Sequence, residues 1–374
     1  DEGGQISAER GLIEQCATDG IYSRDSHTVI QLIDMVVRDL GQDVLEDPEF
    51  ENEDLGEVAI PVEGKGRGIA TDLGASLVSE RLLVERARTA GIWIVGESAT
   101  GVLADTTISE VSHGSFSRTG SGVVVATGAQ MNLDRAHISE TTVAGVWVQG
   151  EVSEVQEVEA LEVMNTVDEV EELSETSVVL SHVSISEVSK GHFTGKRGNG
   201  VHVTHGGKAE VSNANISEND GNGVVAIMEG SQVEISDSIV IGSVEKVESV
   251  ESVESVEEVE EVESGDDEVG NGIAVIHGGA VEAREVVVWG HVQAGVLISH
   301  QAASVEASAK SSEGENSEVE AMSHVSLSEV SIYENGLAMT INGIPGFDLS
   351  ELESFDGENF SVENISSEDF SDLG

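Results

Sequence analysis

The sequence has very little cysteine and no long apolar run. Cys16 is the only cysteine among 374 residues, so a disulfide within the chain is excluded. Its place in the repeat described below matches that of Ala87, which indicates a small side chain in a turn. No apolar stretch approaches the ~18 residues that a membrane-spanning helix requires. The sequence therefore excludes a disulfide scaffold and predicts no spanning helix.

Basic residues are also few. The chain carries 17 Lys and Arg against 72 Asp and Glu, a net charge of −55. Binding to phosphate backbones depends on Lys and Arg, so this balance excludes nucleic acid as a partner. It also argues against anionic membrane surfaces.

Glycine, in contrast, is abundant and regularly placed. A triplet with internal steps of 6 and 17 residues occurs four times, and Gly3 and Gly20 form the tail of a fifth copy. A fixed frame of this kind is typical of a solenoid, in which each repeat stacks on the next. Because the frame is already under way at Gly3, we expect a trimmed or processed chain. The four triplets are Gly68, Gly74, Gly91; Gly122, Gly128, Gly145; Gly200, Gly206, Gly223; and Gly272, Gly278, Gly295.

Apolar residues occupy fixed columns of this frame, with polar residues between them. The first to the third glycine spans 23 residues, which suits one coil of three short strands joined by turns. Each unit then holds two coils, and about ten coils would form a rod on the order of 50 Å long at ~4.8 Å per coil. One column, ten residues after the second glycine, is predicted to form a nearly fully buried ladder. Its members are Ile13, Val84, Ile138, Ile216 and Val288.

Acidic segments interrupt the frame, and the last residues leave it. We expect a β-helix over residues 1–342 with excursions at about 41–64, 151–177, 243–269 and 308–322. The second and third of these excursions carry an apolar residue at every third position, a period that fits neither a strand nor a helix. Such composition is typical of acidic, weakly ordered loops. Residues 343–374 form an acidic tail or cap that contains phenylalanine.

Several glycine-centred segments resemble a known fold. They are Gly66-Arg67-Gly68-Ile69, Thr127-Gly128-Ala129 and Asn219-Asp220-Gly221-Asn222-Gly223-Val224. With these segments the chain resembles the right-handed parallel β-helices of the pectate-lyase-like superfamily over roughly residues 3–341. It is also similar to β-helix repeat proteins found on or outside bacteria, myxobacteria among them. The resemblance implies an all-β solenoid and, together with the acidity, an extracellular or cell-surface location. It implies no particular activity, because a fold does not fix a function.

Carboxylates offer two candidate chemistries in one excursion. Asp266 and Asp267 form the only Asp-Asp pair, and neighbouring aspartates perform acid–base chemistry in polygalacturonase-like hydrolases. The other signatures of those enzymes are absent, and an acidic surface would repel polyuronate substrates. With Glu268, the pair could instead bind Ca²⁺, which prefers oxygen ligands. Solvated surface charge is the third interpretation, and no other cofactor is expected.

Aromatic residues provide the most suggestive outward feature. Tyr22, Trp93 and Trp147 each lie two positions after the third glycine of a unit, although the chain has only five Trp and Tyr residues. Their neighbours Ile92 and Val146 belong to an inward column, so alternation predicts that the aromatic rings point outward. An exposed aromatic column could stack on sugar rings. Alternatively, the excursions fold over the column and bury it.

The tail contains four of the seven phenylalanines: Phe347, Phe355, Phe360 and Phe370. Phenylalanines spaced through a polar tail are typical of a docking segment. The tail could cap its own last coil or contact a neighbouring subunit, since the ends of a β-helix carry unpaired strand edges.

The sequence favours an extracellular structural β-helix protein without catalytic activity that self-associates end to end into an appendage or filament. A carbohydrate-binding or polysaccharide-processing β-helix that uses the aromatic face is the alternative.

Overall fold

The computed structural model describes most of the repeat region and two short segments of the tail. The described residues are 4–41, 66–112, 120–150, 175–190, 198–242, 270–291, 293–299, 323–333, 335, 337–342, 360–362 and 365–366. The four predicted excursions lie almost entirely outside these residues. The described chain contains strands and no helix, so it offers no helix that could cross a membrane.

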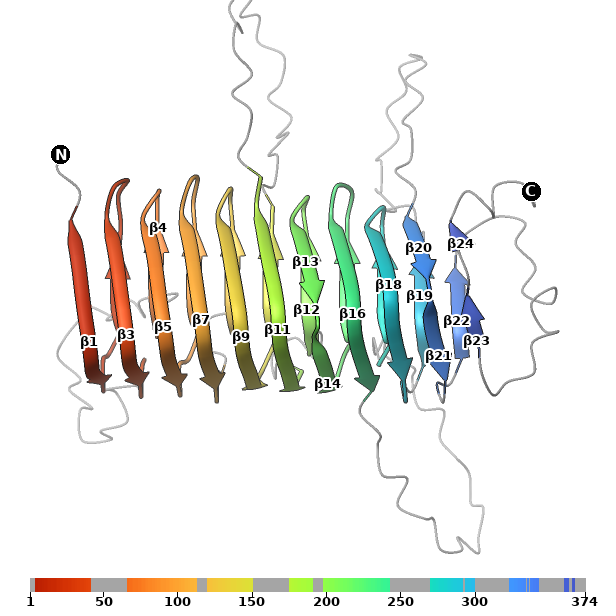
Figure 1. Ribbon diagram of the computed structural model, residues 1–374, viewed down its shortest axis with the longest axis horizontal. Coiled ribbons are helices and arrows are strands. Elements are labelled where there is room, and N and C mark those ends of the chain that lie inside the picture. Colours follow the sequence, from red (N-terminus) through yellow and green to blue (C-terminus); the bar gives the residue numbers. More distant parts are fainter. Residues whose placement is uncertain are drawn as a thin grey trace, which may run out of the picture.

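Parallel strands form two long sheets, and the coils stack along one axis (Figure 1). The larger sheet, sheet A, has fourteen strands and the smaller, sheet B, has ten. Sheet A contains β1 (Gln5–Glu14), β3 (Val29–Arg38), β5 (Ser76–Glu85), β7 (Thr100–Ser109), β9 (Gln130–Thr141), β11 (Ser177–Val188), β13 (Lys208–Ser212), β14 (Asn215–Asn219), β16 (Gln232–Gly242), β18 (Ala280–Trp289), β20 (His324–Ser328), β21 (Val330–Tyr333), β23 (Phe360–Val362) and β24 (Ile365–Ser366). Sheet B contains β2 (Ile21–Ser23), β4 (Arg67–Asp72), β6 (Ala90–Val95), β8 (Ser121–Ala126), β10 (Ala144–Gln149), β12 (Asn199–Thr204), β15 (Val224–Ile227), β17 (Ile273–Ile276), β19 (Ala294–Ser299) and β22 (Leu337–Asn342). The predicted all-β parallel solenoid of about ten coils is confirmed.

Most coils differ in one respect from the predicted three short strands. Most coils have one long strand in sheet A, bent near its middle, and one short strand in sheet B. The bend falls at a residue in the left-handed region, such as Arg81 or Arg135 at φ 55° and 52°. A single left-handed residue turns the chain without ending the hydrogen-bonded ladder. Only the seventh and tenth coils break at this point, into β13 and β14 and into β20 and β21.

The predicted inward ladder is present, and the coils between the repeat units extend it to ten members. Val84, Ile138, Ile216 and Val288 are fully buried. Ile13 is only half-buried, and Ile6 in the same strand is 44% exposed, so the prediction of nearly full burial was wrong for the first coil. Within the described residues, these two side chains have a neighbouring coil on one side only. In register, the ladder runs Ile13, Val37, Val84, Ile108, Ile138, Ile185, Ile216, Val240, Val288, Ile332.

The first and third glycines of the frame stand in one column, because one full coil separates them. A Cβ atom added at Gly122 would lie 2.7 Å from the Gly145 oxygen and closer still to a methyl group of Ile138. Only glycine allows the coils to approach so closely, so the column packs directly against the inward ladder. The column contains Gly20, Gly68, Gly91, Gly122, Gly145, Gly200, Gly223, Gly272 and Gly295.

Two short segments of the tail pair with the sheet A strands of the last coil. β23 pairs antiparallel with β21, and β24 pairs antiparallel with β20. At the opposite end of the rod, β1 pairs with β3 only, within the described residues (Figure 1).

Candidate functional site

The aromatic column lies along the outer face of sheet B. The register places Ala70 between Tyr22 and Trp93, and Val124 between Trp93 and Trp147, so aromatic rings occur on every second coil. Tyr22 is 45% exposed, whereas both tryptophans are half-buried. The intervening Ala70 and Val124 are buried. The three rings therefore form an interrupted row and not a continuous aromatic surface.

An arginine fills the first interruption. The guanidinium carbon of Arg67 lies 5.6 Å from the Tyr22 ring centroid and 5.5 Å from that of Trp93. Arg67 donates through Nε and Nη2 to both carboxylate oxygens of Asp19, at 2.9 and 2.6 Å. Tyr22 donates its hydroxyl to Asp72 at 3.0 Å. These five residues form a compact group, named here the Arg67 cluster.

Electrostatics fix the charges of the Arg67 cluster. Burial lowers the pKa of Arg67, but the hydrogen bonds to Asp19 and the negative charges of Asp19 and Asp72 together outweigh this effect, so the pKa is raised overall. Burial raises the pKa of Tyr22, and the hydrogen bond to Asp72 raises it further. The cluster therefore presents a neutral phenol and a firmly held cation between two aromatic rings. Arginine stacked on aromatic rings and bound by two oxygens of one carboxylate stabilises the packing of neighbouring coils.

The sequence contained a signal for this cluster that the prediction of the aromatic column did not use. Asp19 and Arg67 each directly precede a glycine of the same column. Buried asparagines occupy that position in later coils, where Asn222 donates its side-chain amide to Asn199 at 3.1 Å, and Asn271 donates to Asn222 at 2.9 Å. One column of the repeat therefore carries polar contacts between the first two coils and again from Asn199 to Asn271, with Ala90, Ser121 and Ala144 at the same position in the coils between.

Trp147 is engaged with a buried histidine. Its ring meets that of His202 edge to face at a centroid distance of 5.6 Å. His202 is 2% exposed, and the side-chain amide of Asn199 lies 2.9 Å from its Nδ1. His202 therefore connects Trp147 of the aromatic column to Asn199, and the Trp147 ring packs against the neighbouring coil.

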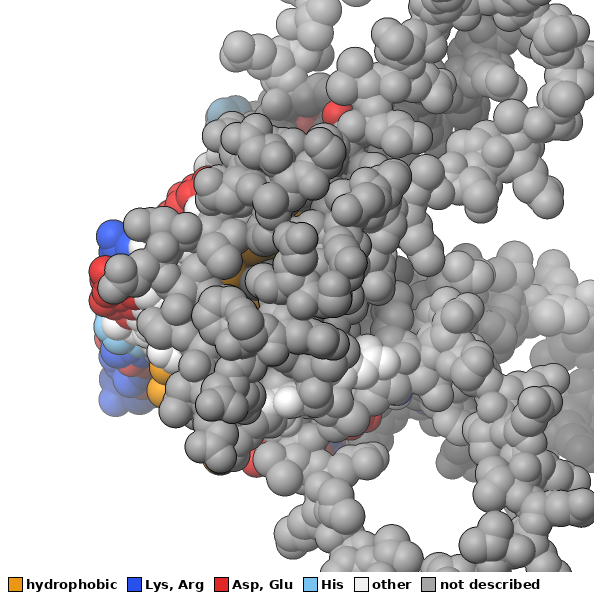
Figure 2. Space-filling model, turned by 90° about the vertical axis from the view of Figure 1, so that its right-hand side faces the viewer, with side chains coloured by type: hydrophobic (Ala, Val, Ile, Leu, Met, Phe, Trp, Pro, Cys, Tyr) orange, Lys and Arg blue, Asp and Glu red, His pale blue; other side chains and the backbone are white. Residues whose placement is uncertain are grey.

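A second feature is a ladder of mostly charged residues at the bend of sheet A, named here the bend ladder. Its members all have positive φ, and their signs alternate over the first five coils. When the rod is viewed from its C-terminal end, basic, acidic and histidine side chains gather along one edge (Figure 2). The ladder runs Arg10, Asp34, Arg81, Asp105, Arg135, His182, Asn213, Asp237, Glu285, Glu329.

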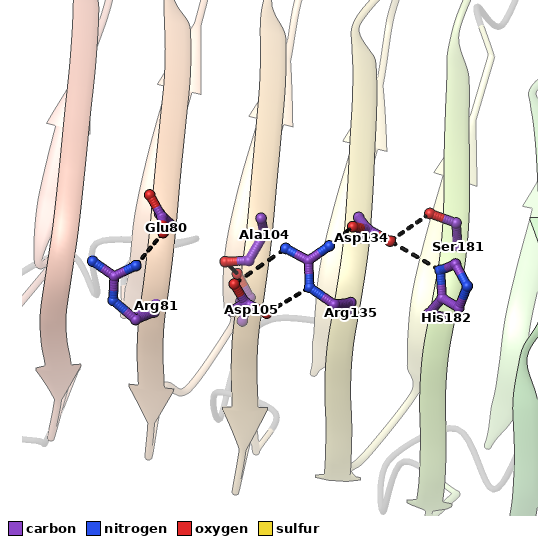
Figure 3. Close-up of polar contacts among 9 residues, drawn as sticks. Glu80, Arg81, Ala104, Asp105, Asp134, Arg135, Ser181 and His182 are labelled. Atoms are coloured by element: carbon purple, nitrogen blue, oxygen red, sulfur yellow. Dashed lines mark hydrogen bonds and ion pairs between the residues drawn. The ribbon is translucent and has the colours of Figure 1, made fainter.

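Ion pairs connect successive members of the bend ladder. Arg81 pairs with Asp34. Arg135 donates to Asp105 at 2.7 and 3.2 Å (Figure 3). The pKa values of Asp34 and Asp105 are both lowered, chiefly by the hydrogen bonds from these arginines. Asp and His accept the left-handed conformation more readily than most residues, which suits them to this bend.

The contacts of the bend ladder continue through the next strand. Asp134 accepts a hydrogen bond from Ser181 at 2.9 Å and lies 3.1 Å from Nδ1 of His182 (Figure 3). These two contacts, with that of Ser181 the larger, lower the pKa of Asp134. The carboxylates of the N-terminal half of the ladder are therefore used in contacts between coils.

The predicted metal ligands Asp266, Asp267 and Glu268 lie outside the described residues. Within the described part of the chain, no three His, Cys, Asp or Glu residues are grouped so that they could hold a metal ion. The proposed calcium site stays a prediction.

Of the predicted assembly residues, the structure places the backbone of Phe360 alone. Phe360 begins β23 and lies opposite Ile332 of the last coil. Phe347, Phe355 and Phe370 lie outside the described residues. Of the two roles that the sequence left open for the tail, the paired segments 360–362 and 365–366 adopt the cap on their own coil.

Comparisons with known proteins give a family and a distant likeness in fold. The family of the right-handed β-helix region matches residues 121–311. The crystal structure of pectate lyase Pel9A is similar at a TM-score of 0.40 and 9% identity, over 86% of this chain and 71% of that chain. The hyper-glycosylated TibA55-350 fragment, whose glycosylation TibC catalyses, gives a TM-score of 0.21 and 9% identity, over 91% of this chain and 100% of that chain. No curated protein matches.

The family match spans just over half of the 374 residues, and it covers coils whose strands pair in parallel in both sheets. The protein therefore belongs to the right-handed β-helix family.

Proposed function

We propose that this protein is a structural β-helix of the cell surface or extracellular space, without catalytic activity, that self-associates through the ends of its rod. One observation carries the proposal: ionisable side chains of the described surface are used to connect one coil to the next. Arg67, Arg81 and Arg135 each pair with a carboxylate of the preceding coil. Side chains that pair in this way hold neighbouring coils together and stiffen the rod. Their hydrogen bonds are already used within the protein.

The high net negative charge and the resemblance to bacterial surface β-helices support the location. A charge of −55 keeps a protein soluble and repels anionic lipids. Head-to-tail growth into a filament additionally requires that the tail leave its own last coil, because β23 and β24 pair with β21 and β20.

The test combines location and activity. An antibody against the purified chain should label intact cells or the culture medium. The purified protein should release neither reducing ends nor unsaturated sugars from acidic and neutral polysaccharides. Confinement to the cytosol, or measurable turnover of any of these glycans, would contradict the proposal.

A carbohydrate-binding role is the second candidate, and the exposed ring of Tyr22 favours it. Tyr22 is the most exposed member of the aromatic column and has an ordered carboxylate, Asp72, within hydrogen-bond distance. Aromatic faces beside carboxylates suit sugars, which combine apolar faces with hydroxyl groups. Titration of neutral and acidic oligosaccharides should then quench tryptophan fluorescence, and Tyr22→Ala should weaken that binding. An unchanged affinity would exclude the aromatic column as the site.

A further inference from the structure

Three turns on one edge of the rod carry the inference. They lead from sheet B into β13, β16 and β18, and they lie side by side along the upper edge in Figure 1. The turns pack directly on their neighbours. A Cβ atom added at Gly230 would lie 3.3 Å from Cα of Gly206, and one added at Gly279 would lie 2.5 Å from the Ala226 oxygen. Side chains at matching positions of these turns therefore start from backbones that are one coil apart.

The first residue of each turn belongs to one column, named here the turn column. The last residues of β12, β15 and β17 are register partners in sheet B, and the residues that follow them directly are His205, Met228 and His277. All three residues have left-handed backbones, with φ of 53°, 75° and 53°. The Met228 N–H donates to the Ile276 carbonyl at 3.0 Å, so the pairing of the coils continues to this position. The turn column therefore places a methionine between two histidines, one coil to either side.

The methionine is the unusual member of this set. Histidine is enriched in the left-handed conformation, so the turn itself accounts for His205 and His277. Met228 is a long apolar residue in the same conformation, and its side chain is 41% exposed. Neither the turn nor packing explains its place there. A thioether is a soft, polarizable group, and soft metal ions take thioether and imidazole as ligands.

The spacing of the coils suits one ion held by all three side chains. Neighbouring strands lie ~4.8 Å apart. A metal ion such as Zn²⁺ binds an imidazole nitrogen at about 2.0 Å and a sulfur at about 2.3 Å. For an ion held at the coil of Met228, each imidazole must lean toward Met228 by roughly 3 Å, which a histidine side chain can reach.

One of the two imidazoles already has an orienting contact. Nδ1 of His205 lies 2.9 Å from the hydroxyl oxygen of Thr204, a residue that is 4% exposed. Histidines that bind metals typically use their second ring nitrogen for a contact of this kind, which fixes the ring. Coordination by His205 would therefore use Nε2.

The ligand set selects the kind of ion. Two imidazoles and a thioether fall short of the four ligands that Zn²⁺ usually takes, and they lack the oxygens that Ca²⁺ prefers. Because one ligand is a methionine, this trio differs from the groups of three His, Cys, Asp or Glu that are absent from the described residues. Thioether ligands select Cu(I), and imidazole also suits copper. The net charge of −55 and the exposed Glu229 beside Met228 favour the approach of a cation.

We propose that His205, Met228 and His277 bind one soft monovalent metal ion, Cu(I), with the Met228 sulfur as the central ligand. Soft ligands favour soft ions, so Ag(I), which carries the same charge and is not oxidised by air, serves as the probe. The site goes beyond the proposed function and does not depend on self-association.

Calorimetric titration of the full chain with silver nitrate in chloride-free buffer tests the site. The starting protein carries Cys16→Ser, because the single free thiol would also bind a soft ion. We expect one ion to bind more tightly than any other. Loss of a residue that merely orients a ligand costs about 10–100-fold in metal affinity, so Met228→Leu should weaken this binding at least as much. His205→Gln and His277→Gln should each weaken it as well.

The matched control moves the methionine along the same column. Leu73 directly follows β4, is 47% exposed and has a φ of 49°, and its neighbour in the next coil is Gly96, which offers no side-chain ligand. Met228→Leu combined with Leu73→Met keeps the composition unchanged and should bind as weakly as Met228→Leu alone. His137→Gln, at an exposed position of β9, should leave the affinity unchanged.

A spectroscopic readout identifies the ligand directly. With methyl-labelled methionine, the Met228 resonance should shift first on addition of Ag(I), and also with Cu(I) in the absence of oxygen. Circular dichroism shows whether each variant keeps the β-sheet spectrum, and the exposure of Met228 makes Met228→Leu the variant least able to disturb the fold.

Four outcomes would overturn the site. They are a Cys16→Ser protein that binds no Ag(I), an affinity that Met228→Leu leaves unchanged, full recovery of binding by Leu73→Met, or a Met228 methyl resonance that does not move. Binding that disappears with Cys16 would assign the ion to the thiol and would likewise overturn the proposal.

Discussion

At the scale of single residues, one buried histidine is the clearest threat to the stability of the fold in acid. His291 is 3% exposed, and its Nε2 donates to the Val240 carbonyl at 3.3 Å. Its Nδ1 is buried without a hydrogen-bond partner in the described part of the chain. Burial lowers the pKa of His291 to about 4, partly offset by the Val240 contact. A proton on Nδ1 would therefore be a buried charge with no acceptor.

This histidine predicts a loss of stability in mild acid. Since its pKa is lower in the folded than in the unfolded state, the unfolded chain takes up a proton first as the pH falls below about 6.5. Stability is thus full above that pH and should fall by about 2 kcal/mol by pH 5. Urea unfolding at pH 7 and pH 5 measures the loss. His291→Gln should lose less, whereas His137→Gln, at an exposed position in β9, should behave as the wild type. Equal losses in all three proteins would contradict the assignment.

The glycine column makes a second prediction for single residues. Gly122→Ala puts a methyl group against Ile138 and 2.7 Å from the Gly145 oxygen. Both neighbours are held within the stack, so we expect a cost on the order of 1–3 kcal/mol or more from overpacking. Gly4→Ala is the control, because the nearest atom to its added methyl group would be 3.9 Å away. Thermal unfolding should separate the two variants clearly, and similar melting temperatures would show that the coils can move apart.

At the scale of elements, each strand places its residues in register with those of the neighbouring coils, and the buried polar residues fix how the coils stack. The Asn222 backbone N–H and side-chain amide both donate to the Asn199 side-chain oxygen, and Asn222 in turn accepts from Asn271. All three are at most 2% exposed. Buried amides connected in this way are costly to interrupt, because the remaining groups lose partners that water cannot replace.

Asn222→Ala should therefore destabilise the rod by about 1–3 kcal/mol. The exposed Asn132 in β9 provides a control of the same residue type, and Asn132→Ala should change stability little. Urea midpoints of the two variants provide the measurement. If Asn132→Ala were the more harmful change, the asparagine contacts would not be what fixes the stacking.

The inward ladder could be predicted from the sequence because it repeats with the glycines, as Val84, Ile138, Ile216 and Val288 show. Ile13 was placed in the correct column, but its burial depends on a neighbouring coil that the column alone does not reveal.

Two other features were not predicted, because the residue types at their positions in the frame change from coil to coil. The bend ladder uses ordinary residues such as Arg81 and Arg135 in the left-handed conformation, where a glycine would have marked the turn. The contact between Asp19 and Arg67 joins residues 48 positions apart, and the intervening length follows no repeat. Periodicity predicts columns, whereas contacts across excursions depend on three-dimensional register.

At the scale of the whole molecule, charge opposes the packing of the core. The net charge is −55 on a slender stack of ten coils, and the arginines of the bend ladder neutralise only a few carboxylates locally. Exposed ion pairs contribute little individually and are weakened by salt, so long-range repulsion dominates the dependence of stability on ionic strength.

The melting temperature should accordingly rise with sodium chloride. Between ~10 mM and ~150 mM salt the Debye length shortens from ~30 Å to ~8 Å, which screens carboxylates on neighbouring coils from one another. Calorimetry or circular dichroism across this range measures the effect, and the rise should shrink near pH 4, where many carboxylates take up protons. A melting temperature that is flat or falls with salt at neutral pH would mean that local ion pairs outweigh the net charge.

A calcium series at matched ionic strength separates screening from binding, because hard-cation coordination by Asp266, Asp267 and Glu268 would raise the melting temperature beyond the sodium chloride curve. Asp266→Asn with Asp267→Asn should then remove that excess alone and leave the sodium chloride curve nearly unchanged.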